Sequence, residues 1–249
     1  MQKSLLLIFL IVCFSTISFS QHKKGTRMPG ATVGSIFYNN GNTDVSFPAP
    51  TQGYSYKTSS FGVSLTPSMG WFISDNTAIG ASLNLNPSGS KTTYEFNGAT
   101  YKKDESTTFN FGIGGFARNY FGNNSSFIPF GQISMNFGIS SLNTEGFFYG
   151  GSGSGAYKDA YDGKSSGGFF TNAALALGLT KMLNEHTGLD IFAGYNYSYS
   201  KNTVKTTSTR DDGANGSIDL TSISEPTNKF TNHGFMIGVG FQVFLQAGK

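Results

Sequence analysis

The chain has 249 residues, among them 33 Gly, 24 Phe and 12 Tyr, and only 12% of its residues are charged. Soluble globular domains carry about 25% charged residues and about 7% Gly, so this balance argues against an ordinary soluble α/β enzyme and favours a β protein. The formal net charge of +3 is too small to predict binding to nucleic acid.

Residues 1–20 have the pattern of a secretory signal peptide. Lys3 supplies the positive start, residues 5–14 form an apolar run, and the small residues Ser18 and Ser20 precede an expected cleavage before Gln21. The run is shorter than the roughly 20 residues of a membrane-spanning helix, so a retained anchor helix is the less favoured interpretation. We expect an exported protein whose mature part is one domain, residues 21–249.

The only cysteine, Cys13, lies inside this apolar run. A lipoprotein signal would have a small residue before the cysteine, but Val12 stands there, so lipidation is not expected. The mature chain then contains no cysteine, which excludes a disulfide, a thiolate metal site and a cysteine nucleophile. No cofactor is expected.

Eight segments of the mature chain alternate apolar residues with small or polar ones, as β-strands with two different faces do. The expected strands lie near residues 31–38, 59–72, 77–86, 106–120, 127–142, 167–183, 187–199 and 232–245. The run 167–183 can also be read as a helix, but its Gly content and its place in the series favour a strand.

The last segment, residues 232–245, has the clearest alternation. Every second residue is apolar, and the residues between are small or mixed; the apolar set is Phe235, Ile237, Val239, Phe241, Val243 and Leu245. The segment is longer than an average soluble strand, but it fits a tilted membrane-spanning strand of roughly 9–11 residues.

The connections between the expected strands alternate in length. The long polar ones cover residues 39–58, 87–105, 143–166 and 200–228, and the short ones cover residues 74–76, 122–125 and 184–186. A transmembrane barrel has short periplasmic turns and long outer loops, which accounts for this asymmetry. The segments around Asn40, Ser90, Gly153 and Gly213 are therefore expected outside the cell.

The two faces of the expected strands indicate which side meets lipid. A transmembrane barrel must present its apolar face outward, whereas a soluble lipocalin-like barrel would turn it inward. The other face consists of Gly, Ser, Asn and Thr with few charges, which suits a packed lumen better than a solvated exterior. Aromatic residues at strand ends are expected to form interfacial girdles: Phe37, Tyr38, Trp71, Phe72, Tyr120, Phe121, Tyr195, Tyr197, Tyr199, Phe241 and Phe244.

On this pattern the chain resembles the small eight-stranded outer-membrane barrels of the OmpA/OmpX type, over nearly the whole mature chain. The resemblance implies an all-β, eight-stranded antiparallel up-and-down transmembrane β-barrel in the bacterial outer membrane, with short periplasmic turns and long extracellular loops. No segment is left for the peptidoglycan-binding domain that some relatives carry.

The end of the chain also looks like the insertion signal read by the outer-membrane assembly machinery. It is carried by Gly238 or Gly240 and then Phe241, Val243 and Leu245. It departs from the usual pattern because residues 246–249 follow, whereas a terminal aromatic residue is usually last.

Candidates for a site with chemistry are few. Arg118 and Asp190 share the lumen face near short turns and are predicted to form an interior ion pair with a structural role. His22, His186 and His233 are too far apart in sequence to predict a metal site. An enzyme would need His233 with a nearby carboxylate, and the spacing fits no catalytic motif.

One segment, residues 211–219, has the acidic and Gly composition of a calcium loop. It has Ser222 where the twelfth position needs an acid, so a solvated loop is the expected structure.

The leading functional interpretation is therefore a non-enzymatic integral outer-membrane barrel, embedded in lipid, whose outer loops serve adhesion, other external contacts or envelope structure. Loop aromatics suit contact with an external ligand such as a glycan: Tyr54, Tyr56, Tyr94, Tyr101, Phe147, Phe148, Tyr149, Tyr157 and Tyr161. Two alternatives remain open, a small pore for ions or solutes and a soluble ligand-binding barrel.

Overall fold

The computed structural model describes residues 23–47, 53–121, 126–151 and 155–246. The expected signal peptide, residues 1–20, lies outside the described residues, as do Gly153 and the turn 122–125. Among the described residues, no helix has the length and apolar character needed to cross a bilayer.

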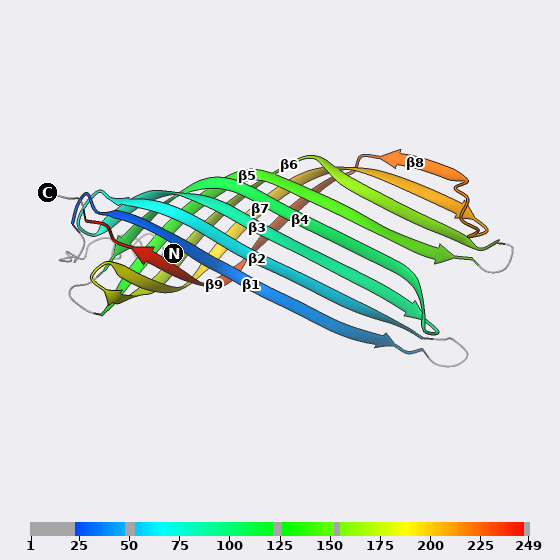
Figure 1. The fold of residues 1–249 in the computed structure, drawn as a ribbon, viewed down its shortest axis with the longest axis horizontal. Helices are drawn as coiled ribbons and strands as arrows, with labels where there is room; N and C mark the ends of the chain where they lie inside the picture. The colour runs from blue at the N-terminus through cyan, green and yellow to red at the C-terminus, as the bar shows by residue number, and fades with distance from the viewer. Residues whose placement is uncertain (1–22, 48–52, 122–125, 152–154, 247–249) are drawn as a thin grey trace, which may run out of the picture.

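The described residues form nine antiparallel strands (Figure 1). Their bounds are β1 Arg27–Val45, β2 Tyr54–Phe72, β3 Thr77–Phe96, β4 Ala99–Tyr120, β5 Phe127–Gly150, β6 Tyr157–Asn184, β7 Thr187–Asp212, β8 Leu220–Ser224 and β9 Thr227–Val243. Successive strands pair in order from β1 to β7, β9 pairs with β7, and β1 pairs with β9. The run 167–183 lies within β6, so the strand interpretation is confirmed.

The ring has eight positions because β8 and β9 share one of them. β8 pairs only with residues 206–210 of β7, and β9 pairs with residues 187–203 of the same strand. The break between them contains Pro226, which has no N–H to give to the ladder and instead accepts the N–H of Val204 at 3.0 Å. The predicted eight-stranded up-and-down barrel is thereby confirmed.

The short turns and the first and last strand ends lie at one end of the barrel, called here the near end. The turns at residues 73–76 and 185–186 lie there, and Arg27 and Leu245 pair there through both backbone N–H groups at 2.8–2.9 Å. The tip of the β3–β4 hairpin lies at the opposite, far end. It has only Asn97 and Gly98 between the strands, with φ of 49° and 77°, as a type I′ turn requires.

The long polar segments are mainly strands rather than irregular loops, and in this respect the expected strand bounds were wrong. Residues 87–105 lie almost wholly in the β3–β4 hairpin, and residues 143–166 lie largely in the β5–β6 hairpin. These segments contain Thr and Tyr, which favour strands, and continued pairing satisfies their backbone groups.

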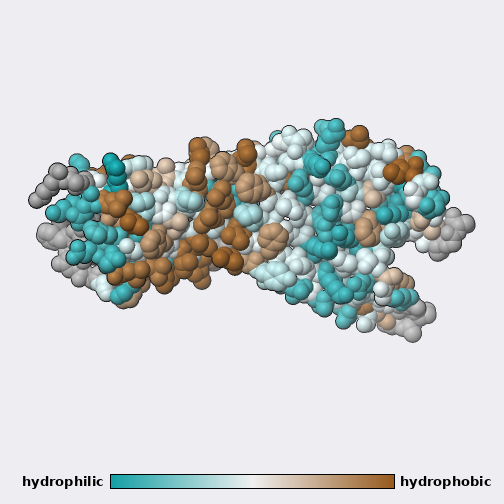
Figure 2. Space-filling model, in the orientation of Figure 1, coloured by the Kyte–Doolittle hydropathy of each residue, from teal (hydrophilic) through white to brown (hydrophobic). Residues whose placement is uncertain are grey.

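The outer face of the barrel carries the predicted apolar residues, which confirms the assignment of faces. Ile133, Leu177 and Ile237 leave 61%, 60% and 75% of their surface exposed, while Asn84, Asn136 and Asp190 are buried inside. Figure 2 shows a hydrophobic band across the visible face of the barrel and mostly hydrophilic side chains towards the far end. We call this band the apolar belt; its outward residues include Val63, Trp71, Ile79, Leu83, Phe111, Ile113, Ile133, Phe137, Leu177, Ile191 and Val239.

The strands are much longer than a membrane crossing requires. β6 has 28 residues, which corresponds to roughly 90 Å at the rise of a strand, whereas the apolar band of an outer-membrane barrel is about 25 Å tall. The parts beyond the belt are called here the extension: residues 39–45, 54–60, 90–108, 140–151, 155–166 and 202–229.

Candidate functional site in the barrel lumen

The structure brings the two predicted lumen residues together. Arg118 on β4 donates from Nη1 to Oδ2 of Asp190 on β7 at 2.6 Å, and the two side chains are 4% and 0% exposed. They face each other across the interior from strands that have two others, β5 and β6, between them. A pair this buried cannot be screened by water, so each charge depends on the other.

The hydroxyl of Tyr120 accepts from Arg118 Nη1 at 3.0 Å, and three further uncharged polar side chains also hydrogen-bond this pair. Gln132 accepts from Arg118 Nε at 2.7 Å, Thr180 donates to Asp190 at 2.6 Å, and Gln242 donates to Asp190 at 3.2 Å. Nothing in the local sequence separates Gln132, Thr180 and Gln242 from other inward polar residues.

A cluster of apolar side chains, called here the plug, fills the lumen at the near end. It consists of Met28, Phe72, Ala78, Tyr120, Ile128, Phe130 and Phe244, each less than 5% exposed. The rings of Phe72 and Tyr120 are stacked at 5.8 Å, and Phe130 lies 5.9 Å from Tyr120. The Arg118 guanidinium lies 4.1 Å from the ring centre of Phe130, so the plug and the ion pair form one closed layer.

The plug corrects part of the predicted aromatic girdle. Phe72, Tyr120 and Phe244 were expected at the lipid interface but are buried inside. They have the parity of the lumen residues on their strands, whereas Trp71 and Phe241 have the opposite parity and are exposed outward at 43% and 46%.

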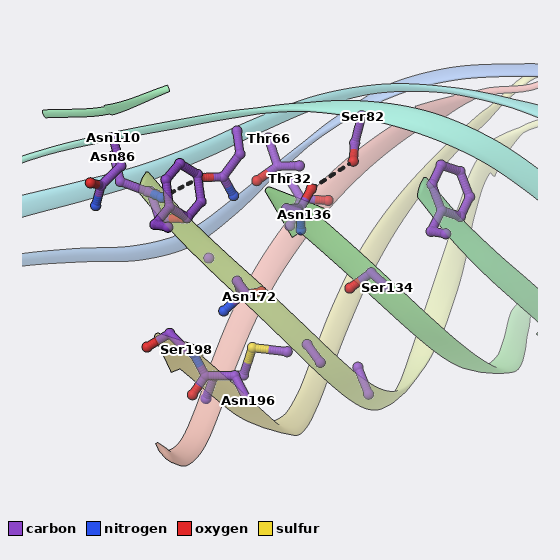
Figure 3. Close-up of a pocket in the computed structure, with 18 of the residues that line it drawn as sticks. Thr32, Thr66, Ser82, Asn86, Asn110, Ser134, Asn136, Asn172, Asn196 and Ser198 are labelled. Carbon is purple, nitrogen blue, oxygen red and sulfur yellow. Dashed lines mark hydrogen bonds between the residues drawn. The ribbon is translucent and has the colours of Figure 1, made fainter. Parts of the chain in front are cut away.

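Above the ion pair lies a polar cavity of about 700 Å³ (Figure 3). Ser82 donates to Asn136 at 3.0 Å within it, and its labelled polar residues are Thr32, Thr66, Ser82, Asn86, Asn110, Ser134, Asn136, Asn172, Asn196 and Ser198. Of the described residues that line it, Arg118 alone is charged, and it is already paired. Within the described ranges no group of His, Cys, Asp and Glu could hold a metal ion. The cavity therefore suits an uncharged ligand with hydrogen-bonding groups.

A second feature lies in the extension, where five aromatic rings form a row across β2 to β6. The row runs in the order Tyr56, Tyr94, Tyr101, Phe148 and Tyr157. The distances between successive ring centroids are 5.5, 6.1, 6.3 and 6.1 Å. Tyr94 and Phe148 have the same parity as the lumen residues of β3 and β5, which places this aromatic row on the concave side. Arg210 covers Tyr157 at 4.5 Å.

Arg210 also binds Asp159 with two hydrogen bonds of 2.7 and 2.8 Å. These bonds hold the pKa of Asp159 below its ordinary value, so the contact stabilises the β6–β7 tip at neutral pH. The stabilisation is lost only when the pH falls through the lowered pKa of the folded state.

We therefore expect amide hydrogen exchange at residues 157–162 and 208–212, corrected for the intrinsic rate, to quicken at pH 2 relative to pH 6. Protonation of Asp159 is the reason. An Asp159→Asn control should show no such step, and equal protection of the unaltered protein at both pH values would contradict the role of the pair.

The remaining candidates have ordinary contacts. His233 Nδ1 lies 2.8 Å from the hydroxyl of Tyr195, and His186 lies in a near-end turn; His22 lies outside the described residues. The Asp211 carboxylate accepts hydrogen bonds from the backbone N–H groups of Asn215 and Gly216 at 3.0 and 2.7 Å. These bonds hold the turn at residues 213–219 in place.

The predicted insertion signal has the expected facing in part. Phe241 and Leu245 are exposed outward at 46% and 47%, Val243 is half-buried, and Gly240 is buried between Thr32 and Asp190. Recognition of this segment by the assembly machinery stays a prediction.

No family model matches the chain, and no curated protein sequence does. Among solved structures, the outer membrane protein OprG from Pseudomonas aeruginosa is 17% identical, with 90% of this chain and 98% of that chain covered and a TM-score of 0.30. Neisserial surface protein A is 12% identical, with 88% and 97% covered and a TM-score of 0.31. The β domain of the Bordetella autotransporter BrkA is 9% identical, with 88% and 99% covered and a TM-score of 0.23. At such TM-scores these likenesses do not bear on function.

Proposed function

We propose that this protein is a non-enzymatic integral outer-membrane barrel, of the small OmpA/OmpX type, that binds a glycan or other external ligand through its extension. The near end faces the periplasm and the far end faces outward. The observation that carries this placement is the apolar belt, whose many large exposed side chains exceed what a soluble protein presents.

The same belt argues against the soluble ligand-binding barrel. A soluble barrel would place its apolar face around the ligand, but here the interior holds Asn, Ser and Thr, and the exterior holds Ile, Leu and Phe. The plug argues against the pore, because aromatic side chains and a salt bridge close the near end. A lumen filled by side chains is usual for eight strands.

The aromatic row supports external binding. Three of its rings, those of Tyr101, Phe148 and Tyr157, line a concave hollow of about 510 Å³ in the extension, together with Gly150 and Gly151. Tyr rings supply flat apolar faces together with hydroxyl groups, a combination suited to sugar rings. In the proposed membrane placement this hollow lies well beyond the bilayer.

Glycan binding can be tested with the purified protein in lipid nanodiscs on a glycan array. We expect Tyr101→Ala with Tyr157→Ala to abolish binding, since the hollow loses two of the aromatic rings that line it. Tyr197→Ala, on the outward face of β7, is the matched control and should bind as the unaltered protein does. Equal binding by all three forms would exclude the row.

Topology gives a further prediction. A peptide epitope inserted at Gly213, in the far-end turn, should be stained by antibody on intact cells, and an epitope at Asp75, in a near-end turn, should not. Permeabilised cells should stain for both. Staining of intact cells at Asp75 alone would reverse the proposed orientation.

A further inference from the structure

The ring closes through an unusually short contact between its first and last strands. Only four residue pairs join β1 and β9, from Gly30–Gln242 to Val33–Val239, whereas seventeen pairs join β9 to β7. Beyond Val33 and Val239, β1 pairs only with β2, and β9 pairs only with β7. The two strands diverge towards the far end (Figure 1), and Figure 2 shows the molecule forking there into two lobes.

This gap between β1 and β9 begins within the apolar belt. Ile36 on β1 is paired with the belt residue Val63 on β2. Ile237 on β9 is paired with Ala193 on β7, which is itself paired with the belt residue Leu177 on β6. The apolar side chains at its edges are strongly exposed: Ile36 73%, Phe37 49%, Phe235 93% and Ile237 75%. The gap therefore opens to lipid rather than to water.

The polar cavity and the gap are continuous. Val63, Phe235 and Ile237 have the outward parity of their strands, yet they line the same cavity as the inward Asn172 and Asn196. An acyl chain lying between β1 and β9 would thus reach the cavity side chains, from which a fully paired barrel wall would separate it.

Two kinds of chemistry meet at this opening. Unpaired N–H and C=O groups along both strand edges are costly in hydrocarbon, so backbone of this kind is tolerated only where it lines a polar space. The cavity offers amide and hydroxyl groups, whereas the outer edges offer Ile and Phe. A ligand that satisfies both needs a hydrogen-bonding head and an apolar tail.

We propose that the gap admits a single-chain amphiphile with a neutral, hydroxyl-rich head from the outer leaflet, with the head in the polar cavity and the tail between β1 and β9. The head is uncharged because Arg118, which alone carries a charge among the described lining residues, is neutralised by Asp190. This inference rests on the proposed placement in the outer membrane, but not on glycan binding by the extension.

The test uses tryptophan fluorescence in phosphatidylcholine vesicles, with 7,8-dibromododecyl maltoside as the quencher. Trp71, the only tryptophan, is first replaced by Phe. Phe170 lines the cavity and is only 5% exposed, so Phe170→Trp then reports on the cavity. Phe137 lies on the belt and is 55% exposed, so Phe137→Trp reports on the belt.

The expected result is saturable quenching of the Phe170→Trp protein at low amphiphile content, while quenching of the Phe137→Trp protein rises in proportion to the content. Asn172→Ala with Asn196→Ala should raise the half-saturating content about tenfold, because the head loses two hydrogen-bonding partners. Dibrominated phosphatidylcholine, with a zwitterionic head and two chains, should not quench the cavity reporter saturably.

Three results would overturn the inference. In the first, quenching of the cavity reporter rises with amphiphile content in the same proportion as quenching of the belt reporter. In the second, the two Asn substitutions leave the half-saturating content of the cavity reporter unchanged. The third is equal saturable quenching by the dibrominated phospholipid. If the belt reporter itself is not quenched, the membrane placement fails as well, so the two failures are distinguishable.

Discussion

Arg118→Ala or Asp190→Ala should each lower the free energy of unfolding by about 3–5 kcal/mol, the cost of leaving one charge of a buried pair without its partner. The 2.6 Å contact lies where neither side chain is more than 4% exposed. The double variant, Arg118→Ala with Asp190→Ala, should lose much less than the sum of the single losses, because no charge is then stranded.

The measurement is reversible urea unfolding in lipid vesicles. Lys57→Ala is the matched control, since Lys57 pairs with Glu95 at 2.9 Å but is 53% exposed; it should lose at most about 1 kcal/mol. Additive losses in the double variant would show that Arg118 and Asp190 do not stabilise the barrel as a pair.

Phe130→Ala should have a comparable effect on stability and should also change conduction. Phe130 is 2% exposed and contacts both Tyr120 and the Arg118 guanidinium, and removal of a buried Phe costs about 3–5 kcal/mol. Because the ring is part of the plug, its removal should also open a water path at the near end.

Planar-bilayer recording tests this second effect. The unaltered protein should show no steady conductance, and Phe130→Ala should conduct. Phe137→Ala, on the belt, is the control and should remain closed. Steady channels from the unaltered protein would instead favour the pore.

Alternation along the strands was sufficient to predict the faces of the barrel. Ile133 and Asn136 differ in parity, and one meets the exterior while the other lines the cavity. The same rule placed Arg118 and Asp190 on the lumen side, and their common distance from short turns placed them at the same depth.

The parity of the aromatic residues could also have identified the plug, but some of its residues are next to outward-facing aromatic residues in the sequence. Trp71 and Phe72 are neighbours in sequence, and both were assigned to a girdle, although successive residues of a strand must face opposite sides. Neighbouring aromatics at a strand end therefore need to be divided by parity before any girdle is proposed.

The gap had no comparable signal in the sequence. Its edges come from β1 and β9, at opposite ends of the chain, and the length of their pairing depends on the tilt and twist of the whole ring. The hydrogen-bond partners of Asp190 were equally hidden, because Thr180 and Gln242 differ from other inward polar residues only in their position in space.

The outward facing of the apolar belt is the central claim, and reversible unfolding in lipid vesicles tests it most directly. Val239 on β9 is 49% exposed. If it meets lipid near the midplane, Val239→Arg should lower the free energy of unfolding by about 2–4 kcal/mol. Asn196→Ser keeps a small polar group in the cavity and should lose little. A Val239→Arg protein no less stable than the Asn196→Ser protein would contradict the membrane placement.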